Sequence, residues 1–145
     1  MDLIRITNPV ELFACEKQVY PLFEKYYEKA KHYLENLETP DIAWKNCVNK
    51  SPFPDYYLYL LKEENEFVGF MAGCLLRMPY FTILFIFDYY APSKGIELYR
   101  MFKQMVKILG VDEIWGESPD KVLNAYKRKL KTATIKKTQM VRIRL

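Results

Sequence analysis

A short loop between a predicted strand and a predicted helix brings together residue types that can hold a phosphate group. Residues 89–96 read Tyr-Tyr-Ala-Pro-Ser-Lys-Gly-Ile. Where a strand passes directly into a helix, the first N–H groups of the helix lack partners and point above the sheet, where they can bind an anion. Lys94 would add a positive charge to such a site. A simpler interpretation is an ordinary strand-to-helix turn, in which Gly95 supplies a permissive backbone.

Two carboxylates near this loop are candidates for proton transfer. Asp88 is the first charged residue after the uncharged strand residues 81–87, so it is predicted to lie at the carboxyl end of a strand, where α/β sheets place ligands. A carboxylate there can accept a proton from a substrate, either directly or through water. It can also simply cap a nearby backbone N–H group. Glu117 ends the next predicted strand and has the same two interpretations.

The elements that position these residues predict an α/β fold in one domain over residues 1–145. Strand-like patterns cover 3–7, 56–62, 67–77, 80–90, 113–117 and, as one or two strands, 132–145. Helical spacing covers 9–34, a segment from 39 that ends before 51, then 96–109 and 118–130. Pro21 is expected to begin a second helical segment or a kink within the first of these. The expected order is β-α-α-β-β-β-α-β-α-β.

The composition indicates a folded protein with an aromatic core. Half of the residues are hydrophobic, and 12 Tyr and 9 Phe are present. The N-terminal residues lack the pattern of a secretory signal peptide, and no apolar run is long enough to span a bilayer. The three cysteines have no metal-ligand spacing, which predicts reduced thiols in a cytoplasmic protein. His32 is the single histidine, so neither a zinc site nor a catalytic triad is expected.

Positive charge is concentrated at the C-terminus. Residues 121–145 contain nine Lys and Arg and no Asp or Glu. The first 120 residues hold the other 13 basic and all 18 acidic side chains, a net charge of −5. The basic quarter could attract an acidic macromolecule or a phosphate-bearing ligand. A solvated surface explains it as well.

The order of elements and four segments resemble the GNAT superfamily of N-acetyltransferases. The segments are NEFVGFMAG at 65–73, YYAPSKGI at 89–96, ILGVDEIWGES at 108–118 and VLNAYKRKL at 122–130. The resemblance covers nearly the whole chain. It implies a mixed, mostly antiparallel central sheet flanked by helices, which splits between two strands so that acetyl-CoA lies in the gap.

The resemblance also assigns roles to residues of this chain. The pantetheine arm would pair with the edge of the strand at Tyr89, Tyr90 and Ala91. The pyrophosphate would bind at Ser93, Lys94, Gly95 and Ile96. The loop is shorter than is usual in the family and holds a single glycine, so Lys94 is expected to supply charge in place of some N–H groups.

The remaining roles concern the proton transfers. Tyr126 matches the tyrosine that the family carries on its last helix, near the thioester sulfur. A phenol with a pKa of about 10 suits the protonation of a departing thiolate. Packing of this tyrosine on the sheet is the alternative interpretation. Asp88 and Glu117 are the candidate bases.

These features predict an N-acetyltransferase that moves an acetyl group from acetyl-CoA to a primary amine of a small molecule or protein. One alternative is a GNAT-fold binding or structural protein without catalysis, of the kind found in some viruses and mobile elements. Another is a nucleic-acid-binding protein that uses residues 121–145. No metal or membrane partner is expected, and the amine acceptor and oligomeric state stay open.

Overall fold

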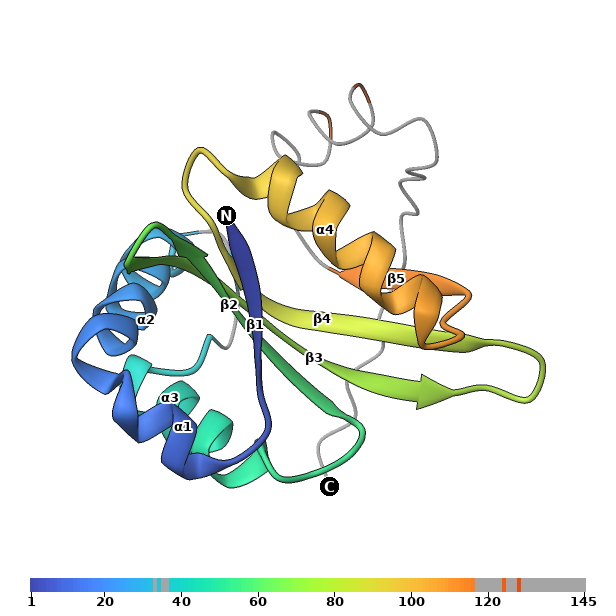
Figure 1. The fold of residues 1–145 in the computed structure, drawn as a ribbon, viewed down its shortest axis with the longest axis horizontal. Coiled ribbons are helices and arrows are strands. Elements are labelled where there is room, and N and C mark those ends of the chain that lie inside the picture. Colours follow the sequence, from blue (N-terminus) through green and yellow to red (C-terminus); the bar gives the residue numbers. More distant parts are fainter. Residues whose placement is uncertain (33, 35–36, 117–123, 125–127, 129–145) are drawn as a thin grey trace.

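The computed structural model describes residues 1–32, 34, 37–116, 124 and 128. Nine elements follow one another in this part of the chain (Figure 1). They are β1 (Asp2–Ile6), α1 (Pro9–Ala14), α2 (Glu16–Ala30), α3 (Pro40–Lys50), β2 (Tyr56–Glu63), β3 (Glu66–Arg77), β4 (Thr82–Tyr90), α4 (Gly95–Ile108) and β5 (Glu113–Gly116).

The five strands form one mixed sheet in the order β1-β2-β3-β4-β5. The first four run antiparallel to their neighbours, whereas β5 runs parallel to β4. The hairpin between β2 and β3 closes through the two residues between the paired Glu63 and Glu66. Glu64 takes a φ of 55° there, in the left-handed region that tight hairpin turns require. The mixed, mostly antiparallel sheet is therefore confirmed.

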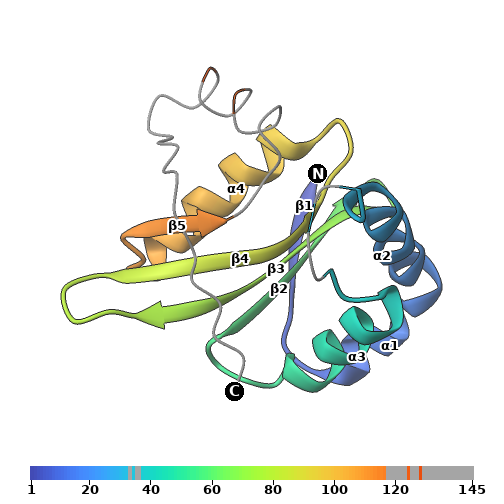
Figure 2. The same cartoon turned by 180° about the vertical axis from the view of Figure 1, so that it is seen from behind.

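Helices cover both faces of the sheet. Helices α1, α2 and α3 lie on one face and α4 lies on the other, as both views show (Figures 1 and 2). Because successive side chains of a strand point to opposite faces, β2 contributes to both cores. Tyr56, Leu58 and Leu60 face α1–α3, and Tyr57, Tyr59 and Leu61 face α4.

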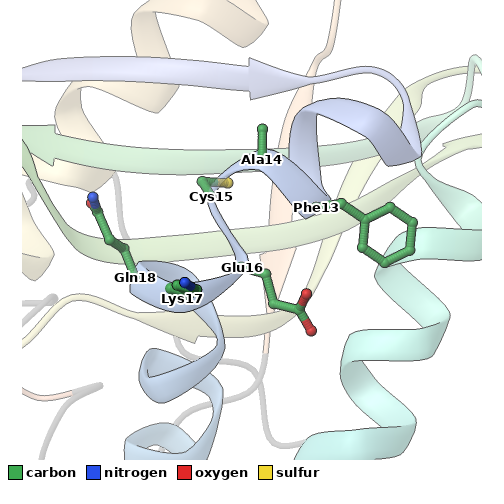
Figure 3. Close-up of a pocket in the computed structure, with 6 residues that line it drawn as sticks. All are labelled: Phe13, Ala14, Cys15, Glu16, Lys17 and Gln18. Carbon is green, nitrogen blue, oxygen red and sulfur yellow. The ribbon is translucent and has the colours of Figure 1, made fainter.

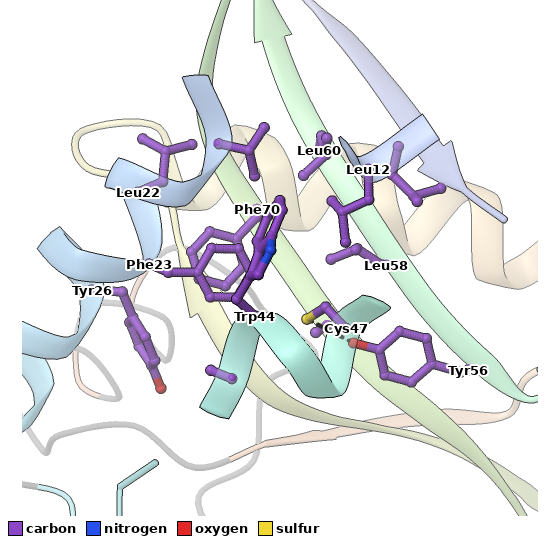
Figure 4. Close-up of a cluster of buried hydrophobic side chains, with 14 of the residues drawn as sticks. Leu12, Leu22, Phe23, Tyr26, Trp44, Cys47, Tyr56, Leu58, Leu60 and Phe70 are labelled. Carbon is purple, nitrogen blue, oxygen red and sulfur yellow. Dashed lines mark hydrogen bonds between the residues drawn. The ribbon is translucent and has the colours of Figure 1, made fainter. Parts of the chain in front are cut away.

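The core under α1–α3 is built on stacked aromatic rings (Figure 4). The rings of Phe23 and Phe70 stack with centroids 4.2 Å apart, and Trp44 meets Phe23 edge-on at 5.6 Å. Such offset and edge-to-face pairs add to the stabilisation from burial. They fix α2 and α3 against β3.

The helix starts follow the expected capping rules. The side chain of Asn8 accepts the N–H of Glu11 at 3.0 Å, and the hydroxyl of Thr39 accepts the N–H of Ile42 at 3.5 Å. A proline follows each cap, where its missing N–H costs nothing. Gly110 follows α4 with a φ of 72°, in the left-handed region that is common just after the end of a helix.

The division of the first helical region differs from the prediction. The break lies at Cys15, whose N–H bonds back to the carbonyl of Leu12 at 3.2 Å and ends α1. Pro21 lies inside α2 and does not end it, because the buried Leu22 and Phe23 hold that helix against the sheet. Three helices therefore precede β2 in place of two. The predicted helix 118–130 and strands 132–145 lie outside the described residues.

No helix in the described ranges is long and apolar enough to cross a membrane.

Candidate functional site

The described pairing between β4 and β5 covers only part of β4. Pairing between these strands runs from Ile83 with Glu113 to Ile86 with Gly116. Strand β4 then continues through Tyr90, and no described strand lies beside it on the β5 side. Within the described part of the chain, residues 87–90 of β4 thus have no partner on this side, and an extended ligand could pair with the N–H and C=O groups of such a strand edge.

A β-bulge lies at the start of this open stretch. Ala72 pairs with Asp88 and Gly73 pairs with Ile86, so Phe87 is the extra residue. The bulge turns both Phe87 and Asp88 toward α2 and α3. The ring of Phe87 lies 6.0 Å from that of Tyr56, and Asp88 lies near Lys50 of α3, whose charge acts on its carboxyl. The bulge therefore directs a carboxylate toward α2 and α3, just beyond the last described pair between β4 and β5.

Asp88 has a perturbed acidity. Burial raises the pKa of its carboxyl to about 6, and the negative charge of Glu38 adds to the rise. The hydrogen bond from Tyr26 and the positive charge of Lys50 act in the opposite direction. A carboxyl with a pKa near 6 is mostly ionised at neutral pH and can still accept a proton readily, as a general base requires.

The loop after β4 is a tight turn that starts α4. The N–H of Lys94 bonds to the carbonyl of Ala91 at 3.1 Å, with Pro92 and Ser93 between them. Ser93 has a φ of 63°, so it takes the left-handed conformation that the turn needs. Gly95 was predicted to supply the permissive backbone at this turn, but Ser93 does so instead, because Gly95 is already the first residue of α4.

Three N–H groups at the start of α4 precede the first hydrogen bond of the helix. The first hydrogen bond of the helix joins the N–H of Leu98 to the carbonyl of Lys94 at 3.0 Å. The N–H groups of residues 95–97 precede it and have no helical partner. Together with the helix dipole they favour an anion. Glu97 lies in the same first turn and opposes that preference.

Lys94 is paired with a carboxylate. Its Nζ lies 3.0 Å from Oε1 of Glu63, at the end of β2. The hydrogen bond to Glu63 raises the pKa of the Lys94 ammonium, so the lysine is charged at neutral pH. An incoming phosphate would share or replace Glu63 as its partner.

The other predicted residues around the junction divide between the two faces. The ring of Tyr90 packs toward α2, 6.4 Å from that of Tyr26. Tyr89 packs on the opposite face, and its hydroxyl donates to the carbonyl of Gly95. Ala91 is buried on that same face. The structure thus brings Asp88, the backbone of residues 89–91 and the start of α4 together at one end of β4.

Glu117 and Tyr126 lie outside the described residues. Two residues of the site that sequence reasoning missed are Tyr26 and Glu63. Tyr26 is one of 12 tyrosines, and no local pattern marks it as a partner of a residue on β4. Glu63 lies just after the predicted strand 56–62, and its pairing with Lys94 depends on how β2 and α4 meet.

A shallow hollow of about 380 Å³ lies elsewhere, at the break between α1 and α2 (Figure 3). Its lining is formed by Phe13, Ala14, Cys15, Glu16, Lys17 and Gln18, none of them a predicted site residue. The thiol of Cys15 lies 3.3 Å from the carbonyls of both Glu11 and Leu12. Burial raises the pKa of this thiol, which disfavours the reactive thiolate.

The cysteines and acidic residues form no metal centre within the described ranges. Cys15, Cys47 and Cys74 are all free thiols. The hydroxyl of Tyr56 donates to Sγ of Cys47 at 3.0 Å in the buried core. Burial raises the pKa of Cys47 to about 12, so it is a packing residue at neutral pH.

No protein-family model matches the sequence, and no curated protein matches it either. Solved structures do match over the full chain. A GNAT family acetyltransferase from Staphylococcus aureus has a TM-score of 0.67 at 18% identity, with 100% of each chain covered. A ribosomal-protein-alanine N-acetyltransferase from Brucella melitensis has a TM-score of 0.67 at 12% identity, with 99% of each chain covered.

A third match is an aminoglycoside acetyltransferase from an uncultured soil metagenomic sample. Its TM-score is 0.68 at 18% identity, with 99% of this chain and 95% of that chain covered. The fold of this chain is therefore that of the GNAT acetyltransferases, as the sequence resemblance predicted. At these identities the likeness concerns the fold.

Proposed function

We propose that this protein is an N-acetyltransferase that moves an acetyl group from acetyl-CoA to a primary amine. The observation that carries the proposal is the stretch of β4 beyond the pair Ile86–Gly116, which has no partner strand on the β5 side among the described residues and begins with a bulge at which Asp88 lies. This stretch supplies a strand edge for an extended ligand, and Asp88 supplies a carboxylate that titrates near neutral pH. The full-length likeness to acetyltransferase structures supports the same reading.

The chain offers complementary groups for the two ends of the donor. The open edge of β4 after Ile86 has the alternating N–H and C=O groups that pair with the amides of a pantetheine arm. The first turn of α4 has free N–H groups and the charged Lys94 for the pyrophosphate. The acetyl group would then lie near the bulge, close to Asp88.

Asp88 is proposed as the general base. An amine that is protonated at neutral pH must lose a proton before its nitrogen can attack the thioester carbonyl, and Asp88 takes that proton directly or through water. The new C–N bond forms as the C–S bond breaks, and the thiolate of CoA takes up a proton. Tyr126 is proposed as the donor of that proton, with Glu117 as an alternative base. Both lie outside the described residues.

Release of the CoA thiol tests this function. The purified chain is incubated with acetyl-CoA and amines of different classes, beginning with an aminoglycoside and an N-terminal alanine peptide, the acceptors named for two structural neighbours. We expect amine-dependent thiol release that falls by about 100-fold or more in Asp88→Asn. Asp55→Asn is the control, because Asp55 pairs with Arg77 on the surface. Release that is equal in wild type and Asp88→Asn would remove Asp88 from the mechanism.

One observation favours a second candidate, a binding protein with this fold that does not use CoA. Lys94 already has a carboxylate partner in Glu63, and Glu97 adds a negative charge to the first turn of α4. Both charges oppose an incoming phosphate. A protein of this kind would show no thiol release and no affinity for CoA.

The third candidate, nucleic-acid binding through residues 121–145, rests on residues outside the described part of the chain. Its signature would be an affinity that falls steeply as the salt concentration rises.

A further inference from the structure

Phe87, the extra residue of the bulge in β4, leaves part of its ring open to solvent directly beside Asp88. The residue is 38% exposed, although it lies in the middle of a largely apolar strand. Its ring packs on that of Tyr56, with centroids 6.0 Å apart and planes at 33°. Tyr56 is buried, and its hydroxyl donates to Sγ of Cys47 at 3.0 Å (Figure 4). Phe87 is therefore supported by a fixed ring and is still accessible to a ligand.

Lys50 places a positive charge above the same ring. It is the last residue of α3, and its Nζ lies 6.0 Å from the centroid of the Phe87 ring. None of the ion pairs between residues that the structure describes includes Lys50, whereas Lys31 and Lys94 are each held by a carboxylate. The charge of Lys50 is thus available to an anionic group of a ligand that reaches the ring.

Asp88 supplies the opposite charge at this point of the sheet. The bulge turns Phe87 and Asp88 toward the helices that end in Lys50. The charges of Lys50 and Asp88 act on each other, since Lys50 partly offsets the rise that burial causes in the pKa of Asp88. Glu38 adds a second negative charge, and Nδ2 of Asn46 lies 2.9 and 2.8 Å from its two oxygens.

The cation, the ring and the carboxylate are complementary to the three parts of an aromatic amino acid. An ammonium group is attracted by Asp88, a carboxylate by Lys50 and an aromatic side chain by the ring of Phe87. An aminoglycoside carries several ammonium groups and no carboxylate, so Lys50 would repel it. The N-terminus of a peptide offers the ammonium without the adjacent carboxylate. The three groups therefore favour the free amino acid.

We propose, on the basis of the acetyl-transfer function above, that the acceptor is a free amino acid with an aromatic side chain. Phe87 binds the side chain and Lys50 binds the carboxylate. The ammonium faces Asp88 and gives that carboxylate a proton. Its nitrogen then forms the C–N bond as the C–S bond of acetyl-CoA breaks, and the thiolate takes up a proton. Phe87 and Lys50 thus determine which amine is acetylated and take no part in the proton transfers.

Binding of L-phenylalanine tests this site without any acetyl transfer. The amide signals of the ¹⁵N-labelled full chain are followed by NMR, with and without CoA, as L-phenylalanine, L-phenylalaninamide or L-alanine is added. The amide lacks the carboxylate and alanine lacks the ring, so we expect each to bind about ten-fold more weakly than L-phenylalanine. The signals of Lys50 and Phe87 should be among those that shift. Equal affinity for the three compounds, or shifts that leave out both residues, would overturn the inference.

The variant Lys50→Gln tests the carboxylate contact. It should remove most of the preference for L-phenylalanine over its amide, because the amide lacks the group that Lys50 binds. Lys45→Gln is the matched control, since it removes the same charge from α3 at a position about 140° away around the helix. The control should keep the preference. A preference lost in both variants, or in neither, would overturn the role of Lys50.

The variant Phe87→Leu tests the contact with the ring. It keeps an apolar side chain in the bulge, and we expect about three-fold weaker binding of L-phenylalanine with no change for L-alanine. Phe13→Leu makes the same change at an exposed phenylalanine of α1 and should bind as the wild type does. An unchanged affinity of Phe87→Leu for L-phenylalanine would overturn the role of the ring.

Acetyl transfer separates this inference from the function on which it rests. In the thiol-release assay, kcat/KM for L-phenylalanine should exceed that for the amide and for L-alanine by about ten-fold. Thiol release with other amines but no preference for L-phenylalanine would overturn this inference alone. Selective binding of L-phenylalanine at Lys50 and Phe87 without thiol release from any amine would overturn the proposed function and leave the amino-acid site standing.

Discussion

The ammonium nitrogen of Lys94 lies 3.0 Å from Oε1 of Glu63, a residue 31 positions earlier in the chain. The cation that begins α4 is therefore held against the end of β2. A phosphate that binds at this turn must therefore compete with Glu63 for Lys94.

Removal of the competing carboxylate should strengthen the binding of CoA. In Glu63→Gln the charge of Lys94 becomes available to phosphate, and we expect the affinity for CoA to rise about three-fold at low salt, as is typical for the loss of an exposed ion pair. Isothermal titration calorimetry measures the change. Glu66→Gln removes a charge from the other side of the same hairpin and should have little effect. Weaker binding in Glu63→Gln would mean that Glu63 supports the site.

Gly69 should tolerate no side chain, because the chain before α4 passes directly over it. A Cβ at this position would lie 2.6 Å from the carbonyl oxygen of Tyr90 and 3.1 Å from Ala91. The backbone must shift to admit it, so Gly69→Ala is expected to lower the free energy of unfolding by about 1–3 kcal/mol. Urea denaturation measures this loss.

Gly116→Ala is the comparison for that variant. A Cβ there would come no closer than 3.3 Å to the carbonyl oxygen of Ile86, a contact that a small shift relieves. We expect a loss below about 1 kcal/mol. Equal stability of the two variants would contradict the close approach at Gly69.

The ionised carboxylate of Asp88 should lower the free energy of unfolding at neutral pH. Its pKa is raised from 3.8 in the unfolded chain to about 6, so the folded state prefers the protonated form. The contribution of Asp88 to the free energy of unfolding is therefore most favourable below pH 3.8 and becomes less favourable as the pH rises to about 6. Asp88→Asn removes this penalty and should be more stable than wild type by on the order of 2 kcal/mol at pH 8. Most of the difference should vanish near pH 4.

Asp55→Asn should have the opposite pH dependence in the same denaturation experiments. Both carboxylate oxygens of Asp55 lie 2.8 Å from the guanidinium of Arg77, which lowers the pKa of Asp55. Its contribution is present above the unfolded pKa and is lost as the pH falls, so this variant is less stable than wild type at pH 8. A destabilised Asp88→Asn at pH 8 would contradict the burial of that carboxylate.

Cys47 should be the last thiol to react with iodoacetamide. It is 2% exposed, and burial raises its pKa to about 12, whereas Cys15 and Cys74 are partly exposed. Alkylation of Cys47 should therefore require unfolding, and mass spectrometry of timed samples identifies the modified residue. Early modification of Cys47 in the native protein would show that the core under α3 opens.

The sequence allowed the strand and helix positions to be predicted well where the pattern is local. The strands predicted at 56–62 and 67–77 and the helix predicted at 96–109 correspond to Tyr56–Glu63, Glu66–Arg77 and Gly95–Ile108, and each follows from the spacing of nearby residues. The break at Cys15 was missed because Pro21 is the stronger local signal. Burial of Leu22 and Phe23 overrides that signal.

The site was predictable only in part, because its contacts join distant segments. The position of Asp88 at a strand end and of Lys94 at a helix start could be predicted from neighbouring residues. Their partners Tyr26 and Glu63 could not, because each depends on the packing of a helix against a strand far away in the chain. The bulge at Phe87 leaves no trace in a run of apolar residues that would suit a regular strand as well.

The central claim is that acetyl-CoA binds along residues 87–90 of β4 with its phosphates at the start of α4. Calorimetric titration of acetyl-CoA and of CoA into the wild type and into Lys94→Glu tests it most directly. Lys107→Glu, the same charge reversal in the last turn of α4, is the control. We expect micromolar binding to the wild type and the control and a sharp loss in Lys94→Glu. Absence of binding up to millimolar ligand, or equal binding to all three proteins, would contradict it.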